Sequence, residues 1–355
     1  MPGRIYYFAN QIYQFGHALP LYNAAGGVFI LKKLKRVIEF GMHVRGVPLY
    51  NNERSFLNTP RFMVKDIKSA TDLEGVIISL SNSAIRRDPD RCRTIYIGHG
   101  MGDKKFGEGD TGRLLESYDY HFISGPKHLE KLKDSGVDIP ESRRVEIGNL
   151  RFDGYVNRAG ERARILAARG IADTGRKNIL FAPTWKWGAG TLQRYGRLFA
   201  GELTGEYNLI IRPHSHDRKY IPGLRRWASR KGVENLYFSD STDLARYDIM
   251  DDFIISDLMI SDTSSILYEY LITRKPIIVA RNDFSDLHAM PDRMNVMKYV
   301  SVFDEGGDIR KLVSENLSDP GSEARYGELL HNCFSFNDGR SVERAVAFID
   351  SILPL

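Results

Sequence analysis

A run of small hydroxyl and carboxyl side chains stands between two apolar segments and has the composition of an anion site. Asp262, Thr263, Ser264 and Ser265 follow the apolar run Leu258–Ile260 and precede apolar residues at helical spacing. The apolar run is typical of a buried parallel strand, and the small polar residues are typical of a helix start. Backbone N–H groups and hydroxyls at such a junction bind phosphate. The segment alone indicates either a phosphate site or an ordinary capped helix.

A second cluster combines an arginine and a histidine on one stiff turn. Arg212, Pro213 and His214 follow the apolar run 209–211, so we expect them at the end of a strand. Arginine recognises phosphate through paired N–H groups, and histidine donates to phosphate or exchanges a proton near neutral pH. Pro213 restricts the backbone of the turn and so holds the two side chains in a fixed relation. His216 is expected to face solvent, and a surface turn that happens to contain histidine is the alternative.

The third candidate is a histidine between two glycines in the first half of the chain. His99 lies between Gly98 and Gly100 directly after the apolar run 94–97, with Lys104 behind it. Open α/β sheets bind ligands at the carboxyl ends of their strands, and glycine lets a ligand approach the backbone closely. This loop is therefore a candidate ligand site.

Parallel sheets would bring these motifs together, and the apolar runs of the sequence predict such sheets. Short apolar runs alternate with helical patterns, which indicates an α/β fold with mostly parallel strands. Gly16 and His17 are expected in a polar loop before a short helix at 19–25. We expect strands at 5–8, 28–31, 76–80, 94–97, 120–124 and 145–148, and then at 178–182, 209–211, 236–238, 258–260 and 276–280.

The length of the chain and one change of composition predict two domains. A chain of 355 residues exceeds the usual size of a single core. Between 153 and 178 the sequence becomes rich in arginine and alanine and then polar, which indicates a boundary near residue 170.

Composition and charge narrow the classes of protein. Hydrophobic residues make up 42% and charged residues 27% of the chain, as in ordinary globular proteins. No apolar run approaches the roughly 20 residues of a membrane span, and Met1–Arg4 leads directly into an apolar run, so neither a span nor a signal peptide is expected. Cys92 and Cys333 form neither a disulfide framework nor a metal cluster, which suits a reducing cytoplasm. A net charge of +5 suits an anionic partner, while the spacings typical of nucleic-acid binding are absent.

The order of the motifs resembles that of GT-B glycosyltransferases and, more narrowly, of the CDP-glycerol glycerophosphotransferase family of teichoic-acid synthesis. The resemblance covers about residues 95–345. It implies two Rossmann-like α/β domains whose mostly parallel sheets face a central cleft, with the acceptor in residues 1–170 and the nucleotide donor in 171–335. A C-terminal helix within 336–355 is expected to pack back toward the first domain. The matching segments are His99-Gly100 with Lys104-Lys105, Gly148 with Arg151 and Asp153, Phe181–Trp185, Arg212–His214, Ile255–Ser265, and Asp338-Gly339 with Arg344.

The family resemblance also implies a reaction and roles for the candidate residues. An acceptor hydroxyl attacks the β-phosphorus of a CDP-linked donor, glycerol phosphate moves across, and CMP leaves. His99 is then the candidate general base, and His214 is the second catalytic candidate. A solvated helix position is the alternative for Glu269. The donor phosphates are assigned to Arg212, His214, Thr263, Ser264 and Ser265, the ribose to Glu269, and further possible contacts to Gly100, Lys104, Thr184 and Asp262.

Neither a cofactor nor a metal ion is required by this interpretation. Asp251 and Asp252 come nearest to a paired-carboxylate site. On a helix before Phe253, they are expected to cap the helix or to face solvent rather than to hold magnesium.

The expected partners are a CDP-linked donor, a lipid-linked or polymeric cell-surface glycan, and a weakly bound anionic membrane surface, without nucleic acid. The basic residues of 32–36 alternate with apolar ones, which predicts a solvated helix face packed on a sheet or, less often, a membrane-surface helix. The protein is therefore expected in the cytoplasm, peripheral on the inner face of the membrane. Two other classes stay open: a GT-B enzyme with a nucleotide-sugar donor, and a non-catalytic protein that binds phosphate-rich polymers.

Overall fold

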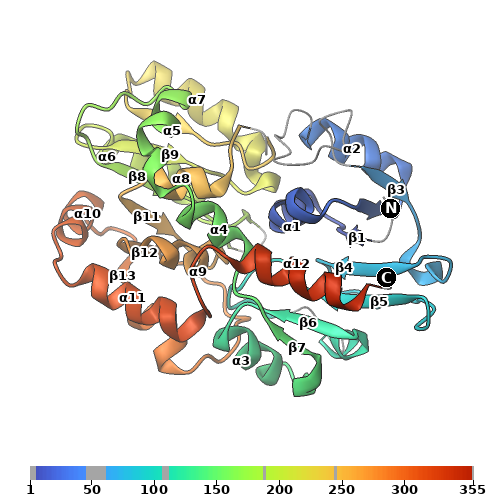
Figure 1. The fold of residues 1–355 in the computed structure, drawn as a ribbon. Coiled ribbons are helices and arrows are strands. Elements are labelled where there is room, and N and C mark those ends of the chain that lie inside the picture. Colours follow the sequence, from blue (N-terminus) through green and yellow to red (C-terminus); the bar gives the residue numbers. More distant parts are fainter. Residues whose placement is uncertain (1–4, 45–60, 106–111, 187–188, 244–245, 354–355) are drawn as a thin grey trace.

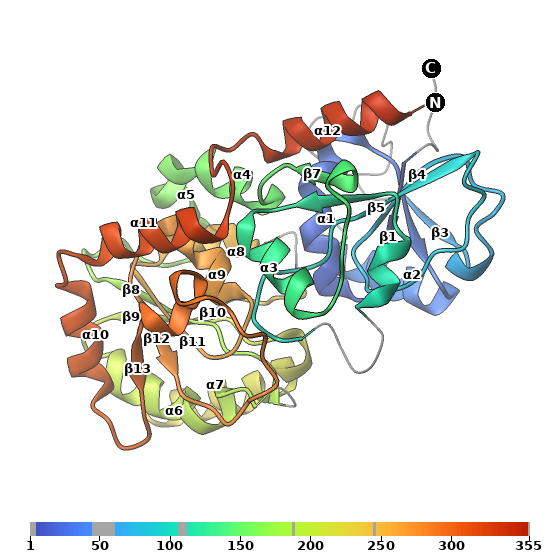
Figure 2. The same cartoon turned by 90° about the horizontal axis from the view of Figure 1, so that it is seen from below.

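Parallel strands and the helices between them make up the structure, a computed structural model in which residues 5–44, 61–105, 112–186, 189–243 and 246–353 are described. Met1–Arg4, on which the expectation of no signal peptide partly rests, lie outside the described residues. Figure 1 shows two sheets in two adjoining lobes, each with helices around it, and Figure 2 shows the same lobes from below. The predicted α/β class is confirmed.

Every strand expected from an apolar run forms within two residues of its expected bounds, and two further strands appear. The additional strands are β3 and β13, each only three residues long and each at the edge of a sheet. The first sheet consists of β1 (Ile5–Phe8), β2 (Val28–Leu31), β3 (Phe62–Val64), β4 (Gly75–Ser79), β5 (Cys92–Tyr96), β6 (Tyr120–Ile123) and β7 (Arg144–Glu146). The second consists of β8 (Asn178–Phe181), β9 (Asn208–Ile211), β10 (Leu236–Phe238), β11 (Leu258–Ser261), β12 (Ile277–Ala280) and β13 (Ser301–Phe303).

Both sheets are parallel throughout, and both are buried on two faces. The strand orders are β3-β2-β1-β4-β5-β6-β7 and β10-β9-β8-β11-β12-β13. Along β1, Tyr7 faces one core and Phe8 the other, and along β8, Leu180 and Phe181 divide in the same way. Helices on both faces exclude water from these strands, which explains their nearly continuous apolar sequences.

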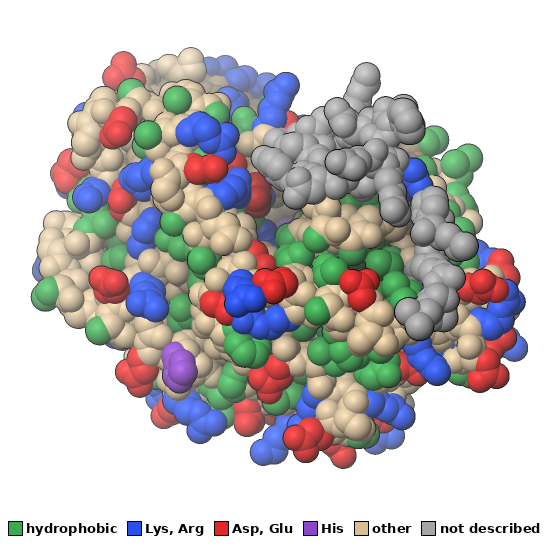
Figure 3. Space-filling view, viewed as in Figure 1, with side chains coloured by type: hydrophobic (Ala, Val, Ile, Leu, Met, Phe, Trp, Pro, Cys, Tyr) green, Lys and Arg blue, Asp and Glu red, His purple; other side chains and the backbone are tan. Residues whose placement is uncertain are grey.

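The helices that cover the sheets differ widely in length. None of the described helices is long and apolar enough to cross a bilayer. On the face drawn in Figure 3, basic and acidic side chains are interspersed over both lobes. The helices are α1 (Ile12–Ala25), α2 (Leu34–Val44), α3 (Pro126–Asp134), α4 (Leu150–Val156), α5 (Arg162–Ala168), α6 (Leu192–Leu203), α7 (Ile221–Arg230), α8 (Ile249–Ile255), α9 (Ile266–Tyr270), α10 (Ile309–Leu317), α11 (Ser322–Cys333) and α12 (Ser341–Ile352).

Helix α1 corrects one expectation from the sequence. Gly16 and His17 lie inside this helix and not in a loop, and Pro20 is also accommodated within it. The helix forms because its apolar residues recur at helical spacing and pack into the core beside the first sheet, which outweighs the unfavourable propensities of glycine and proline. The correction matters because one face of α1 lines the site described below.

Helix α12 returns from the second lobe and packs beside the first sheet. Ala345 and Ile349 join the same core as Phe122 and Leu150, and α12 contacts both α1 and α4. The carboxylate of Asp153 accepts the first free backbone N–H groups of α12, at 3.0 and 2.8 Å. The last helix is therefore tied to α4, the first helix in the connection between the two sheets.

Candidate active site

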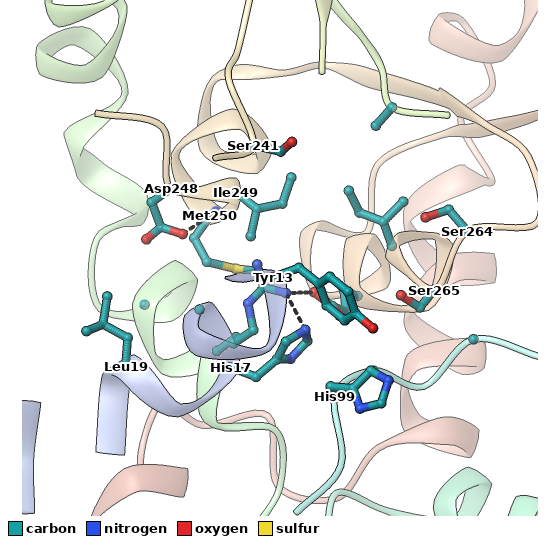
Figure 4. A pocket seen from close by; sticks show the side chains of 18 of the residues that line it. Tyr13, His17, Leu19, His99, Ser241, Asp248, Ile249, Met250, Ser264 and Ser265 are labelled. Atoms are coloured by element: carbon teal, nitrogen blue, oxygen red, sulfur yellow. Dashed lines mark hydrogen bonds and ion pairs between the residues drawn. The ribbon is translucent and has the colours of Figure 1, made fainter. Parts of the chain in front are cut away.

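A pocket of about 990 Å³ lies between the two sheets and contains side chains from both. Its walls come from α1, from the loop after β5, from α4, and from the loops after β8, β9 and β11. These loops follow the carboxyl ends of parallel strands, where such sheets bind ligands. Of the candidates predicted from the sequence, all line the pocket except Asp262, which lies beneath its wall. Figure 4 shows the part of the pocket that holds Tyr13, His99 and Ser265.

His99 is held in one tautomer by the backbone of the first sheet. Its Nδ1 lies 2.5 Å from the carbonyl oxygen of Leu80. A carbonyl only accepts, so Nδ1 must donate, and the lone pair of the neutral ring is on Nε2. Burial lowers the pKa of His99 below its usual value, which keeps the ring neutral at neutral pH. The ring is therefore prepared to accept a proton on Nε2.

His214 is held in the opposite tautomer. Its Nδ1 accepts the backbone N–H of His216 at 3.3 Å, so the proton of the neutral ring is on Nε2. Burial, His216 and Lys104 lower the pKa of His214 to about 4. At neutral pH the ring therefore carries no charge and offers a neutral hydrogen-bond donor. Trp185 stacks on the ring with centroids 5.8 Å apart, and His216 is exposed.

Arg212 is anchored at one end of its guanidinium group and open at the other. Nη1 donates to Ser239 Oγ, to the carbonyl of Tyr247 and to Asp252 Oδ2, at 2.8 to 2.9 Å. Within the described residues, Nε and Nη2 make no hydrogen bond, and the side chain lines the pocket. The anchored arginine can therefore bind a ligand oxygen with its remaining donors.

The paired aspartates differ from the expectation that they cap a helix or face solvent. Asp248 caps α8 instead. Asp252 is 1% exposed and forms ion pairs with Arg212 at 2.8 Å and Arg169 at 3.5 Å, and Asp251 also pairs with arginine. Buried carboxylates persist when they are paired. These two hold arginines in place.

Ser264 and Ser265 present donors that the rest of the described chain does not use. Neither their hydroxyls nor their backbone N–H groups donate to a described residue. Thr263 differs, because its Oγ1 accepts a hydrogen bond from Asn282 Nδ2 at 3.1 Å. The helix α9 has only five residues, so its dipole contributes little, and the unused donors are what this surface offers to an anion.

The glycine loop after β5 packs directly on Ser265. A methyl group at Gly100 would lie 3.0 Å from Ser265 Oγ, and one at Gly102 would lie 2.7 Å from Ser265 Cα. Gly100 also has a φ of +124°, a conformation that other residues rarely adopt. Glycine therefore lets the first sheet's loop and the second sheet's helix form one continuous wall.

Lys104 brings a positive charge from the first sheet into the second sheet's half of the pocket. Its Nζ donates to Thr184 Oγ1 at 3.1 Å, and burial lowers the pKa of this lysine. Asp262 lies below, fully buried, and accepts from Thr184 N, Thr191 N and Thr191 Oγ1. Desolvation raises the pKa of Asp262 to about 6. Asp262 is thus placed to shape the loop after β8, whereas Lys104 and Thr184 face the pocket.

Glu269 is a buried member of a three-residue contact and not a solvated helix residue. Only 2% of it is exposed, and its Oε2 accepts Arg151 Nη1 at 2.6 Å. The same Arg151 nitrogen lies 3.4 Å from His17 Nε2. Desolvation raises the pKa of Glu269, and Arg151 opposes this rise. The contact joins α1, α4 and α9 across the pocket, and Figure 4 labels its member His17, from which a dashed line runs.

Several lining residues were not predicted from the sequence. Tyr13 and His17 were missed because a polar loop, and not the first half of α1, was expected around Gly16. Lys131 of α3 lines the pocket although it is 4% exposed, and burial lowers its pKa to about 7. In the sequence, only the helical spacing between Lys131 and other buried residues of α3 could have indicated that Lys131 lines the pocket. Within the described residues, no group of three histidine, cysteine or acidic side chains converges as a metal site would.

A family model described as CDP-Glycerol:Poly(glycerophosphate) glycerophosphotransferase matches residues 84–351, which is most of the chain. The chain belongs to this family. Membership makes it a transferase and confirms the resemblance inferred from its motifs.

Individual members of the glycerophosphotransferase family are distant in sequence. The teichoic acid ribitol-phosphate primase of Bacillus spizizenii is 24% identical over 270 residues, covering 72% of this chain and 66% of the primase. The ribitol-phosphate polymerase TarL of Staphylococcus aureus is 30% identical over 181 residues, covering 48% of this chain and 30% of TarL. The chain therefore spans about two thirds or less of these relatives.

Solved structures share the fold. The wall teichoic acid polymerase TagF superposes with a TM-score of 0.65 at 17% identity, over 99% of this chain and 89% of that chain. The S. aureus MnaA–UDP structure gives a TM-score of 0.58 at 14% identity, over 99% of this chain and 97% of that chain. These likenesses confirm the predicted GT-B-like class.

The Arg151–Glu269 ion pair yields a first prediction. Arg151→Gln leaves a buried carboxylate without its counter-charge and is expected to lower the free energy of unfolding by about 3 kcal/mol. In the double variant with Glu269→Gln, neither charge remains, so the loss is expected to be smaller than the sum of the two single losses. Chemical denaturation of the four proteins measures this coupling. Arg310→Gln is a matched control, since its 53%-exposed pair with Glu202 is worth little. Additive losses at 151 and 269 would contradict the assigned contact.

Proposed function

We propose that this chain transfers a polyol phosphate, in the first instance glycerol phosphate, from a CDP-linked donor to a hydroxyl of a lipid-linked or polymeric cell-surface glycan. One observation carries the proposal: two neutral histidines from opposite sheets face one pocket in opposite tautomers. His99 offers an acceptor nitrogen and His214 a donor N–H. An in-line displacement needs both, one for the attacking hydroxyl and one for phosphate.

The proton and the bonds are then accounted for in one step. The acceptor hydroxyl loses its proton to His99 Nε2 as its oxygen bonds to the β-phosphorus. The bond from that phosphorus to the bridging oxygen breaks, and CMP leaves with the electron pair. His214 donates to a phosphate oxygen, while Lys104 and Arg212 supply positive charge.

The two halves of the chain receive different substrates in this proposal. Residues 1–170 form the acceptor side, 171–335 the nucleotide-donor side, and 336–355 the helix that returns to the first. Ser264 and Ser265 hold the diphosphate with hydroxyl and backbone donors. Glu269 keeps Oε1 for the ribose, because Arg151 occupies Oε2. Ile249 and Met250 give the same part of the pocket apolar walls that suit a base.

The donor site predicts a binding defect without unfolding. Replacing Ser264 and Ser265 together by alanine removes two hydroxyl donors to a charged ligand, each worth about 1.5 kcal/mol or more. CDP affinity measured by calorimetry is therefore expected to fall by at least about tenfold. Ser229→Ala, at an exposed position on α7, should bind CDP like the wild type. Unchanged affinity in a folded double variant would remove the donor site from this position.

The two tautomers predict that replacing His99 and replacing His214 have different effects on turnover and CDP affinity. His99→Ala should lower turnover by about 100- to 10,000-fold and leave CDP affinity nearly intact, because only the acceptor's proton is affected. His214→Ala should lower both turnover and CDP affinity. His331→Ala, exposed on α11, is the control. Weaker CDP binding in His99→Ala, with unaltered binding in His214→Ala, would reverse the assignment.

The same assignment fixes the sign of the pH dependence. His99 works as a base only when deprotonated, so kcat/KM should fall as the pH drops through its pKa. Burial places that pKa below 6.5, and the acidic limb of the profile is expected there.

The proposal includes a location for the protein. It lies peripherally on the cytoplasmic face of the membrane, and this membrane contains the lipid-linked acceptors. Helix α2 supports it. Phe40 is buried against the first sheet, yet Leu34, Ile38 and Met42 are 65%, 59% and 69% exposed at fourth-residue spacing. Lys32, Lys33 and Lys35 are exposed beside them. An apolar row flanked by lysines suits an anionic bilayer surface.

Flotation with anionic vesicles tests this localisation. The wild type should float at low salt and less at high salt, because exposed electrostatic attraction is screened. Ile38→Asp with Met42→Asp should abolish flotation, whereas Leu198→Asp, at a 40%-exposed leucine on α6, should not. Equal flotation of the α2 variant and the wild type would exclude α2 as the contact.

A further inference from the structure

One face of α1 forms a wall of the pocket that the proposed chemistry has not used. The lining residues recur along the helix with the spacing of a single face, while the opposite face packs into the core of the first sheet. Tyr13 stands at the end of this face nearest the two histidines. The lining residues of α1 are Tyr13, Gly16, His17, Leu19, Pro20 and Asn23.

The ring of Tyr13 contacts both candidate catalytic histidines. Its centroid lies 5.5 Å from that of His99 and 6.1 Å from that of His214. The two histidines belong to different sheets, and the tyrosine ring contacts both of them. Figure 4 shows the ring beside His99 with its hydroxyl on the side where Ser265 lies. A phosphate that both histidines contact therefore lies within reach of the Tyr13 side chain.

The hydroxyl of Tyr13 is an unused donor in a half-buried position. It makes no hydrogen bond to any residue of the described ranges, although tyrosine hydroxyls in such surroundings usually find a partner. Burial raises the pKa of Tyr13 above its usual value, so the hydroxyl keeps its proton at neutral pH. The group is therefore a neutral donor that a ligand oxygen can engage.

We propose that Tyr13 is a further catalytic residue, whose hydroxyl donates a hydrogen bond to the transferring phosphoryl group between His99 and His214. This inference rests on the proposed function. The phosphoryl oxygens share the charge of the transition state, and a donor aimed at them lowers the barrier. CDP carries ground-state phosphates only, whereas the proposed contact strengthens as charge develops on the transferring phosphoryl oxygens, so it counts mainly in turnover.

Tyr13→Phe tests the proposal, because it removes one oxygen and keeps the ring in contact with both histidines. Turnover of the CDP-linked donor is expected to fall by about 100-fold, with CDP affinity within about twofold and an unchanged melting temperature. Tyr207→Phe, outside the pocket, is the matched control and should keep full turnover.

Each other outcome has one meaning. Full turnover in Tyr13→Phe would overturn the inference, and so would a loss of turnover explained by an equal loss of CDP affinity. If the wild type itself transfers no polyol phosphate from any CDP-linked donor, the proposed function fails. The inference about Tyr13 is then overturned as well. That result differs from full turnover in Tyr13→Phe, which can be observed only when the wild type is active.

Discussion

The packing of the loop after β5 against the start of α9 is the contact on which this site depends. Asp103 fixes it: its carboxylate accepts the hydroxyl of Tyr268 on α9 at 2.8 Å and pairs with Lys127 of α3. The Lys127 side chain is fully buried, and its ammonium also lies 3.7 Å from the ring centroid of Tyr268. Removing Asp103 would leave that charge unpaired, which is strongly unfavourable. The loop is therefore not free to leave the helix, and His99 stays in the same pocket as Ser265.

Once the loop is fixed, burial sets the protonation of the site. Desolvation lowers the pKa of both His99 and His214, so proton transfer and hydrogen bonding are assigned to neutral rings. Positive charge comes from Lys104 and Arg212 instead. Asp252 holds Arg212 through Nη1, and this leaves the other donors for a ligand. Charges positioned before the substrate arrives need little reorganisation during the reaction.

Most of the fold was predictable because it depends on local patterns. Buried parallel strands appear in sequence as short apolar runs, and all of those runs became strands. The short edge strands β3 and β13 were missed, although β7 and β10, equally short and also at sheet edges, were predicted. The first half of helix α1 was misread, since Gly16 in a polar stretch suggests a loop and tertiary packing overrides it.

The site was predictable where motifs follow strands and unpredictable where contacts are long-range. His99, Arg212, His214 and Ser264 all follow strands and line one pocket. The partner of Glu269 is 118 residues away in sequence, and that of Arg212 is 40 residues away. Such pairings depend on how the two sheets face each other, which no local spacing reveals. Placing Tyr13 in the site required the same information about how the two sheets face each other.

The identity of the nucleotide product tests the central claim most directly. Attack at the β-phosphorus of CDP-glycerol breaks the bond between the two phosphates and releases CMP. A sugar transferase acting at the anomeric carbon would release a nucleoside diphosphate. The measurement is to incubate the wild-type chain with CDP-glycerol, CDP-ribitol and common nucleotide sugars, each with an acceptor, and to separate the nucleotides by chromatography. This account predicts acceptor-dependent release of CMP from a CDP-polyol; release of a nucleoside diphosphate from a nucleotide sugar, without CMP from either polyol donor, would contradict it.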